Sequence, residues 1–255
     1  MCKAKFIPMI SDEEKNEVDD LINEYNIKIN NLHIMFGDNK FIAGIFGNIE
    51  EDVKDFFKYD HFIESINDLA LKTKISVEKC LDMYQEINYN DFNPLVNPTD
   101  DKEHLAYYFL ENALLREVML WESLGQLYNL YFKQNLEPEK VNYKTIINNL
   151  FQKKEKTIDF EFLKNYVFEE YDKDNPSIEK GIHNCVCYYR NQLTHRYSIA
   201  ITSLSYNTNL RAMPDLIYKI GKDYNVVLKF LMEIVDLIAN KINSEKTVDK
   251  IINFN

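Results

Sequence analysis

The chain has 255 residues, of which 45% are hydrophobic and 28% are charged, a composition typical of a globular protein. Its formal net charge of −11 disfavours broad, non-specific binding to nucleic acid, because such binding depends on neutralising many phosphates. It has no apolar run near the roughly 18 residues of a membrane span and no secretory signal at its start, so we predict a cytoplasmic protein.

Residues 1–98 are predicted to form a mostly helical N-terminal extension. Ser11 and Glu14 have the spacing of a capping box, which indicates that a helix begins there. Two apolar runs flank a Gly-Asp-Asn turn within 32–46, a pattern that suggests one small β-hairpin. A proline-containing linker is predicted over 88–100. The helices predicted in this extension cover residues 11–29, 48–71 and 76–87.

Residues 99–255 are predicted to form a helical bundle, so the fold class expected for the chain is all-α. A long helix is expected from residue 99 or 100 to about 134, with Leu105 among the apolar residues on its buried side. Pro138 is well placed in the first turn of the next helix, which is expected to end near residue 154. Further helices are predicted over 159–171, 177–203 and 214–242.

Neither the cysteines nor the glycines form a recognisable cofactor motif. No two of the four cysteines have CxxC spacing, and Cys185 and Cys187 lack a nearby second Cys/His pair, so we predict free thiols and no metal site. The glycines do not have the spacing of a phosphate-binding loop or of a dinucleotide-binding fingerprint. We therefore predict that the protein has no cofactor.

Acidic residues are missing from one long segment. The segment from Lys180 through Pro214 contains no Asp or Glu, although the chain has 41 of them. Three of the four arginines of the chain fall in this segment, namely Arg190, Arg196 and Arg211. The planar guanidinium group binds phosphate or carboxylate with two parallel hydrogen bonds, so this segment is a candidate anion site. The alternative is a basic, partly buried helix that packs against acidic neighbours.

The helix predicted over 177–203 has two distinct faces. Arg190, Asn191 and His195 fall away from its apolar stripe, and so do His183, Cys187 and Thr194. This polar face has no lysine and no acid, so we expect it to meet another helix or a ligand. Asn191 and His195 are one turn apart, which would let the amide orient the imidazole. The stripe predicted to face the core consists of Ile182, Val186, Tyr189, Leu193, Tyr197, Ala200 and Leu204.

The sequence Arg190-Asn191-Gln192-Leu193-Thr194-His195 resembles the R-x4-6-H motif of the HEPN superfamily, including the polar residue directly after the arginine. The resemblance covers the motif and, loosely, residues 99–245. It implies an all-helical domain. Many members are metal-independent ribonucleases that act as dimers, with the two motifs meeting across the interface. Other members are toxins paired with a nucleotidyltransferase, and some bind nucleotides without cleaving them.

The resemblance predicts a metal-independent endoribonuclease, and toxins and defence effectors are the roles that it suggests. His195 would act as the acid and base on the 2′-hydroxyl and the leaving 5′-oxygen, Arg190 would stabilise the phosphoryl transition state, and Asn191 would complete the catalytic set. Thr194, Arg196 and Arg211 would contact substrate phosphates, although Arg196 fits a structural ion pair equally well.

Arg190 and His195 are about 140° apart around the helix, so a second copy across a two-fold axis could complete the site. The expected partners are RNA, a second copy of the chain and an antitoxin or nucleotidyltransferase, with no membrane. Two other functions stay open. One is a non-catalytic HEPN-like module that binds a nucleotide or a partner protein, and the other is a structural, dimerising helical bundle.

Overall fold

The computed structural model describes residues 51–85, 95–173, 179–195, 197–202, 212 and 215–244. All regular secondary structure in these residues is helical, which confirms the all-α fold class for this part of the chain. The helix predicted over 11–29 and the hairpin predicted over 32–46 lie outside the described residues.

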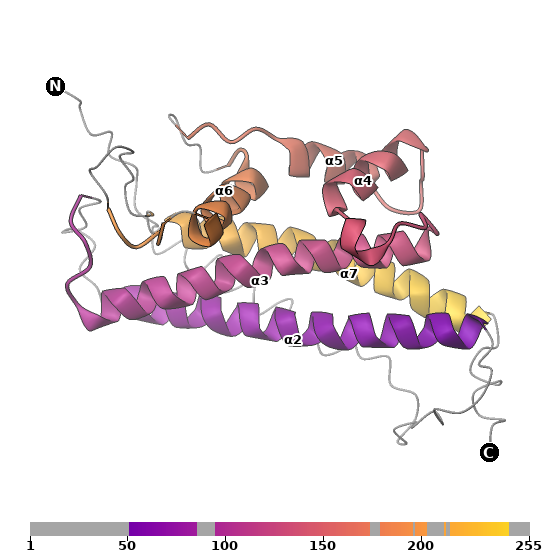
Figure 1. Ribbon diagram of the computed structural model, residues 1–255, viewed down its shortest axis with the longest axis horizontal. Helices are drawn as coiled ribbons and strands as arrows, with labels where there is room; N and C mark the ends of the chain where they lie inside the picture. Colours follow the sequence, from indigo (N-terminus) through magenta and orange to yellow (C-terminus); the bar gives the residue numbers. More distant parts are fainter. Residues whose placement is uncertain are drawn as a thin grey trace, which may run out of the picture.

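Three long helices form the body of the molecule (Figure 1). α2 (Glu51–Gln85) and α3 (Asp101–Tyr131) lie side by side in antiparallel directions, and α7 (Asp215–Ser244) packs against both. Three shorter helices cover α3 and α7 on the opposite side from α2 (Figure 1). They are α4 (Tyr143–Gln152), α5 (Phe160–Phe168) and α6 (Ile182–His195).

The described helices share one hydrophobic core. Its largest fully buried side chains come from α2, α3, α5 and α7 and include Trp121, Tyr107, Tyr128, Tyr224 and Phe160. The hydroxyl of Tyr224 on α7 donates to the backbone oxygen of Ala70 on α2, so α2, which belongs to the extension predicted over 1–98, is tied into this core. The boundary at residue 98 stays a prediction.

α2 is one continuous helix, so the prediction of two helices over 48–71 and 76–87 is wrong. The second helix was expected to begin at Ser76. Instead the hydroxyls of Thr73 and Ser76 donate to the carbonyls of Leu69 and Lys72 one turn earlier, and these hydrogen bonds are made within the helix. An ion pair between Lys72 and Asp68 supports the same turn.

α3 begins where the sequence predicts, because the Asp100 side chain accepts a hydrogen bond of 2.7 Å from the backbone of Lys102. The prediction that Leu105 is buried is wrong, since this side chain is 45% exposed. Ala106 and Leu110 begin the buried stripe instead. Four leucines further along the helix are completely buried, as predicted, namely Leu114, Leu120, Leu124 and Leu127.

The ends of the remaining helices differ modestly from the predictions. Pro138 begins a short 3-10 turn (Pro138–Lys140) and not the predicted α-helix, because Asn142 caps α4 four residues later by accepting from the backbone of Thr145. Asp159 caps α5 as expected, and α7 spans the predicted last helix. In the part of the chain that the structure covers, no helix has the length and apolar character of a membrane span.

Candidate functional site

The helix that carries the predicted motif begins at a glycine. Gly181 has a φ of +62°, and a Cβ at this position would clash with the carbonyl of Glu170. Its backbone N–H donates to the carboxylate of Glu169 at 2.8 Å, and Asn184 in the first turn donates to the Glu169 carbonyl at 2.6 Å. These contacts start α6 at Ile182, five residues later than predicted.

α6 ends at His195, so the prediction that the helix continues to about residue 203 is wrong. Beyond it the chain turns, and Ser198 donates to Glu111 of α3 at 3.0 Å. Tyr197 is 42% exposed, which contradicts its predicted place in the buried stripe. Helical periodicity predicts the direction of a side chain only within the helix itself. Ala200 is buried as predicted, but it lies in a turn and not in a helix.

Arg190 is half-buried beside an acidic residue of α3. Its Nε atom is sealed from solvent and has no hydrogen-bond partner. Burial raises the pKa of Glu122, and the charge of Arg190 together with a hydrogen bond from the Tyr143 backbone opposes that rise. Glu122 therefore balances the guanidinium charge while leaving its buried Nε donor unused.

Asn191 and His195 are both exposed, as the sequence predicted, and they lie one turn apart. No described residue forms a hydrogen bond with either side chain, so the expected contact between the amide and the imidazole is not made in the single chain. Thr194 is also exposed, and its hydroxyl donates to the carbonyl of Arg190 at 3.0 Å. Arg196 and Arg211 lie outside the described residues.

The prediction that His183 and Cys187 face away from the core is wrong. The side chain of His183 is fully buried, and Cys187 is only partly exposed and packs against the core. α6 contacts α3, α5 and α7, so more than one stripe of its surface is covered. A helix wedged among three others buries polar residues that a one-sided pattern would place outside.

His183 belongs to a buried polar network whose centre is Asp223 of α7. The Asp223 carboxylate accepts hydrogen bonds from Trp121 Nε1 at 3.0 Å and from the Tyr166 hydroxyl at 2.9 Å. It also accepts from His183 Nδ1, which is 3.1 Å from one carboxylate oxygen and 3.2 Å from the other. Three donors thus satisfy a carboxylate that is fully removed from water.

The other nitrogen of His183 faces a hydroxyl and a thiol. The Tyr143 hydroxyl lies 2.7 Å from His183 Nε2, and Cys187 Sγ lies 3.4 Å from the same nitrogen. Burial opposes ionisation of His183, but the charge and hydrogen bond of Asp223 outweigh it and raise the pKa of this histidine to about 9. Burial likewise disfavours the Cys187 thiolate, yet the bond and charge of His183 prevail and lower the pKa of the thiol.

Glu117 is the unsatisfied member of this buried cluster. Both of its carboxylate oxygens are inaccessible to solvent and have no hydrogen-bond partner. Burial raises the pKa of Glu117 well above its ordinary value, and the nearby charges of Asp223 and Cys187 act in the same direction. Glu117 is therefore held in its neutral form next to a thiol and a second carboxyl group.

The sequence analysis missed this cluster, although the sequence contains signals for it. Glu117 falls at a helical step from the buried Leu114 and Trp121, and Asp223 falls between Ile220 and Val227 in an otherwise apolar stripe. A charged residue at a core position of a strongly periodic helix indicates a buried polar network, because burying an unpaired charge is costly.

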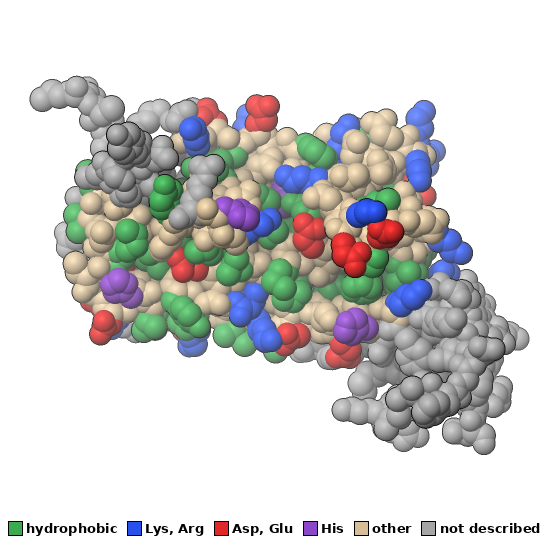
Figure 2. Space-filling model, viewed as in Figure 1, with side chains coloured by type: hydrophobic (Ala, Val, Ile, Leu, Met, Phe, Trp, Pro, Cys, Tyr) green, Lys and Arg blue, Asp and Glu red, His purple; other side chains and the backbone are tan. Residues whose placement is uncertain are grey.

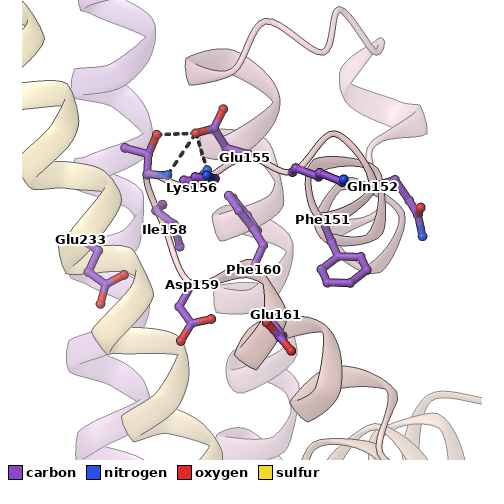
Figure 3. Close-up of a pocket in the computed structure, with 11 residues that line it drawn as sticks. Phe151, Gln152, Glu155, Lys156, Ile158, Asp159, Phe160, Glu161 and Glu233 are labelled. Atoms are coloured by element: carbon purple, nitrogen blue, oxygen red, sulfur yellow. Dashed lines mark hydrogen bonds between the residues drawn. The ribbon is translucent and has the colours of Figure 1, made fainter.

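A separate hollow opens at the turn between α4 and α5 (Figure 3). No residue of α6 lines it. The Glu155 carboxylate accepts from the backbone N–H groups of Lys156 and Thr157 and from the Thr157 hydroxyl, and these bonds lower the pKa of Glu155. Four acidic side chains and two lysines, Lys154 and Lys156, line the hollow, so its net charge is negative and disfavours a phosphate ligand. Its acidic side chains are Glu155, Asp159, Glu161 and Glu233 (Figure 3).

No group of three or more metal-binding side chains occurs among the described residues. The chain matches no protein-family model, no curated protein and no solved structure. The resemblance to the HEPN superfamily therefore rests on the motif from Arg190 to His195.

Proposed function

We propose that the protein is a metal-independent endoribonuclease of the HEPN type. The observation that carries the proposal is the pairing of a half-buried Arg190, whose Nε donor is unused, with an exposed His195 at the end of the same helix. A buried donor without a partner is unfavourable in the free protein, so a movement of the guanidinium that lets Nε bond to an incoming anion is favoured. A substrate phosphate is such an anion.

The chemistry needs a proton acceptor, a proton donor and a stabiliser of negative charge. His195 removes the proton from the 2′-hydroxyl, and the same residue or its copy in a second chain protonates the leaving 5′-oxygen. The guanidinium of Arg190 stabilises the charge that gathers on the phosphoryl oxygens. Asn191 is one turn before His195 and orients the imidazole once the substrate or a partner chain closes the site. Thr194, Arg196 and Arg211 contact flanking phosphates.

A cleavage assay tests this proposal. RNA incubated with the purified protein in EDTA should be cut, and the products should end in a 2′,3′-cyclic phosphate, because the attacking group is the neighbouring hydroxyl. His195→Ala should abolish cleavage, and Arg190→Ala should slow it about a hundredfold or more. His104→Ala and Arg116→Ala are matched controls on α3, since His104 is also exposed and Arg116 is bonded to Asn112 within its own helix.

Full activity of His195→Ala, or no cleavage of any RNA by the wild-type chain, would overturn the ribonuclease proposal. The second candidate is a non-catalytic module that binds a nucleotide. One observation favours it, namely that neither Asn191 nor any other described residue bonds to His195. A catalytic histidine usually has a partner that fixes its tautomer. Saturable nucleotide binding that is lost in Arg190→Ala, without cleavage, would select this candidate.

A homodimer is part of the proposed function, and an exposed apolar stripe on α3 supports it. Figure 2 shows apolar side chains on the face that α2 and α3 form. Glu111 and Glu122 adjoin this stripe, and they face Ser198 and Arg190, so a copy packed on the stripe would lie beside the motif. The stripe consists of Leu105, Tyr108, Leu115 and Met119, all exposed and spaced by helical steps.

The double variant Leu115→Glu/Met119→Glu should shift the protein from dimer to monomer in light scattering at micromolar concentration, because it places two charges in the proposed interface. The matched control is Leu71→Glu/Ile75→Glu, which changes two exposed apolar residues with the same spacing on α2. A wild-type chain that is already a monomer would contradict the dimer. Dimers in both variants would instead place the interface elsewhere.

A further inference from the structure

Cys187, His183 and Asp223 are arranged in the order of a nucleophile, a base and an orienting carboxylate. The Sγ atom of Cys187 lies 3.4 Å from His183 Nε2, and His183 Nδ1 lies 3.1 Å from Asp223. Trp121 Nε1 donates at 3.0 Å to the other oxygen of that carboxylate, so the group that orients the imidazole is itself held in place. Activated nucleophiles in proteins have this arrangement, in which the base is itself oriented by a third group.

Cys187 is partly exposed, whereas the rest of the arrangement is sealed. His183 and Asp223 are completely buried. Cys80 and Cys185, the other cysteines in the described residues, are both buried. Among the described cysteines, Cys187 therefore combines access from solvent with a histidine at hydrogen-bond distance.

Two further groups bear on the ionisation of the thiol. The Tyr143 hydroxyl is 3.5 Å from Cys187 Sγ and can donate to a thiolate. Glu117 has two buried oxygens without partners and lies near enough to interact with Cys187 electrostatically. An anionic reagent would have to give up its hydration in this buried surrounding and approach the Asp223 carboxylate, so the surroundings favour a small, uncharged electrophile.

We propose that Cys187 is an activated thiol and a site of covalent modification by small, uncharged electrophiles, with hydroperoxides as the natural class. In the reaction with hydrogen peroxide, the sulfur attacks one peroxide oxygen, an S–O bond forms and the O–O bond breaks. The proton that His183 holds on Nε2 passes to the departing hydroxide and forms water. Sulfur loses two electrons, peroxide gains them, and Cys187 becomes a sulfenic acid.

A reactivity assay tests this proposal by comparing the thiol of Cys187 in the folded protein and in the urea-unfolded chain. The probe is iodoacetamide, and the modification of Cys187 is followed by peptide mass spectrometry with fragmentation that separates it from Cys185. At pH 6 Cys187 should react about tenfold faster in the folded protein than in the urea-unfolded chain, because an ordinary thiol is almost entirely protonated there. Unfolding also exposes Cys187 completely. Burial in the folded protein can only slow the reaction, so a faster reaction in the folded state cannot come from better access.

Variants locate the cause of that reactivity. His183→Gln should remove the advantage of the folded state at pH 6, and Tyr143→Phe, which deletes only a hydroxyl, should reduce it. The near-ultraviolet signal of Trp121 reports whether each variant keeps the core. If His183→Gln does not fold, the wild-type pH–rate profile decides the question, since the rate of an activated thiol levels off at a lower pH than the rate of the same thiol in the unfolded chain.

Peroxide is the second probe. A mass increase of one oxygen at Cys187, trapped with a reagent for sulfenic acids and absent in Cys187→Ser, is the expected product. The proposal is overturned if the unfolded chain reacts faster with iodoacetamide at every pH from 6 to 8, or if peroxide leaves Cys187 unmodified. These measurements do not involve RNA, so their outcome is independent of whether the protein is a ribonuclease.

Discussion

At the scale of single residues, the core contains two carboxyl groups in opposite situations. Asp223 receives hydrogen bonds from Trp121, Tyr166 and His183, whereas Glu117 receives none. A buried ion is tolerated when donors replace the lost water, and an unpaired one is not. Glu117 therefore stays protonated, and its burial makes the stability of the protein depend on pH.

Glu117→Gln should stabilise the protein by an amount that grows with pH. The pKa of Glu117 is raised in the folded state, so the unfolded chain releases this proton first, above its ordinary value of 4.5. Stability from this residue is then lost as pH rises, and glutamine removes the loss without changing the shape of the side chain. The difference in melting temperature between variant and wild type should be larger at pH 8 than at pH 5, measured by circular dichroism. An equal or smaller difference at pH 8 would contradict the neutral Glu117.

At the scale of helices, α6 is defined by its two ends. Gly181 starts the helix with a positive φ against the Glu170 carbonyl, and the chain turns away after His195. His195 is therefore the last residue of α6, and its side chain is exposed. The first turn, by contrast, is fixed between α5 and α7, where His183 meets Asp223.

Gly181→Ala should destabilise the protein by about 1–3 kcal/mol, because alanine is strained at this φ and its Cβ meets backbone that cannot move aside. Lys133→Gly is the matched control of opposite sign. Lys133 has a φ of +48°, so glycine there relieves strain and should leave stability unchanged or slightly raised. Urea unfolding measures both variants, and an alanine variant as stable as the wild type would refute the strain at residue 181.

The sequence allowed the prediction of most helices but fewer of their ends and faces. Periodicity and caps located α3, α5 and α7, because Asp100 and Asp159 bond locally to the helices they begin. Ser76 was misread because a serine also bonds back within a helix. The motif side chains of α6 could be placed outside, since Asn191 and His195 need only the helical period. His183 and Asp223 could not be paired, because their contact joins residues 40 apart in the chain.

At the scale of the whole molecule, α2 is part of the same core as the helices after residue 99. The buried face of α2 packs against α3 and α7, and Tyr224 on α7 bonds to Ala70 on α2. The motif on α6 is supported in turn by α3 and α7. The geometry of Arg190 and His195 therefore depends on α2, a helix that we predicted to belong to an N-terminal extension.

A chain that begins at residue 99 should fail to fold cooperatively by itself. It lacks α2, so the faces of α3 and α7 that α2 covers would meet water, and the lost apolar burial is a large part of a marginal stability. The expected signs are a broad urea transition and a weak near-ultraviolet signal from Trp121. Adding a peptide of residues 51–85 in trans should restore both, while a peptide in which Ile63, Ile66 and Ala70 are replaced by Asp should not, because these residues are buried in the core. A sharp transition for residues 99–255 alone would show that they form an independent domain, and that α2 packs on this domain without being needed for its folding.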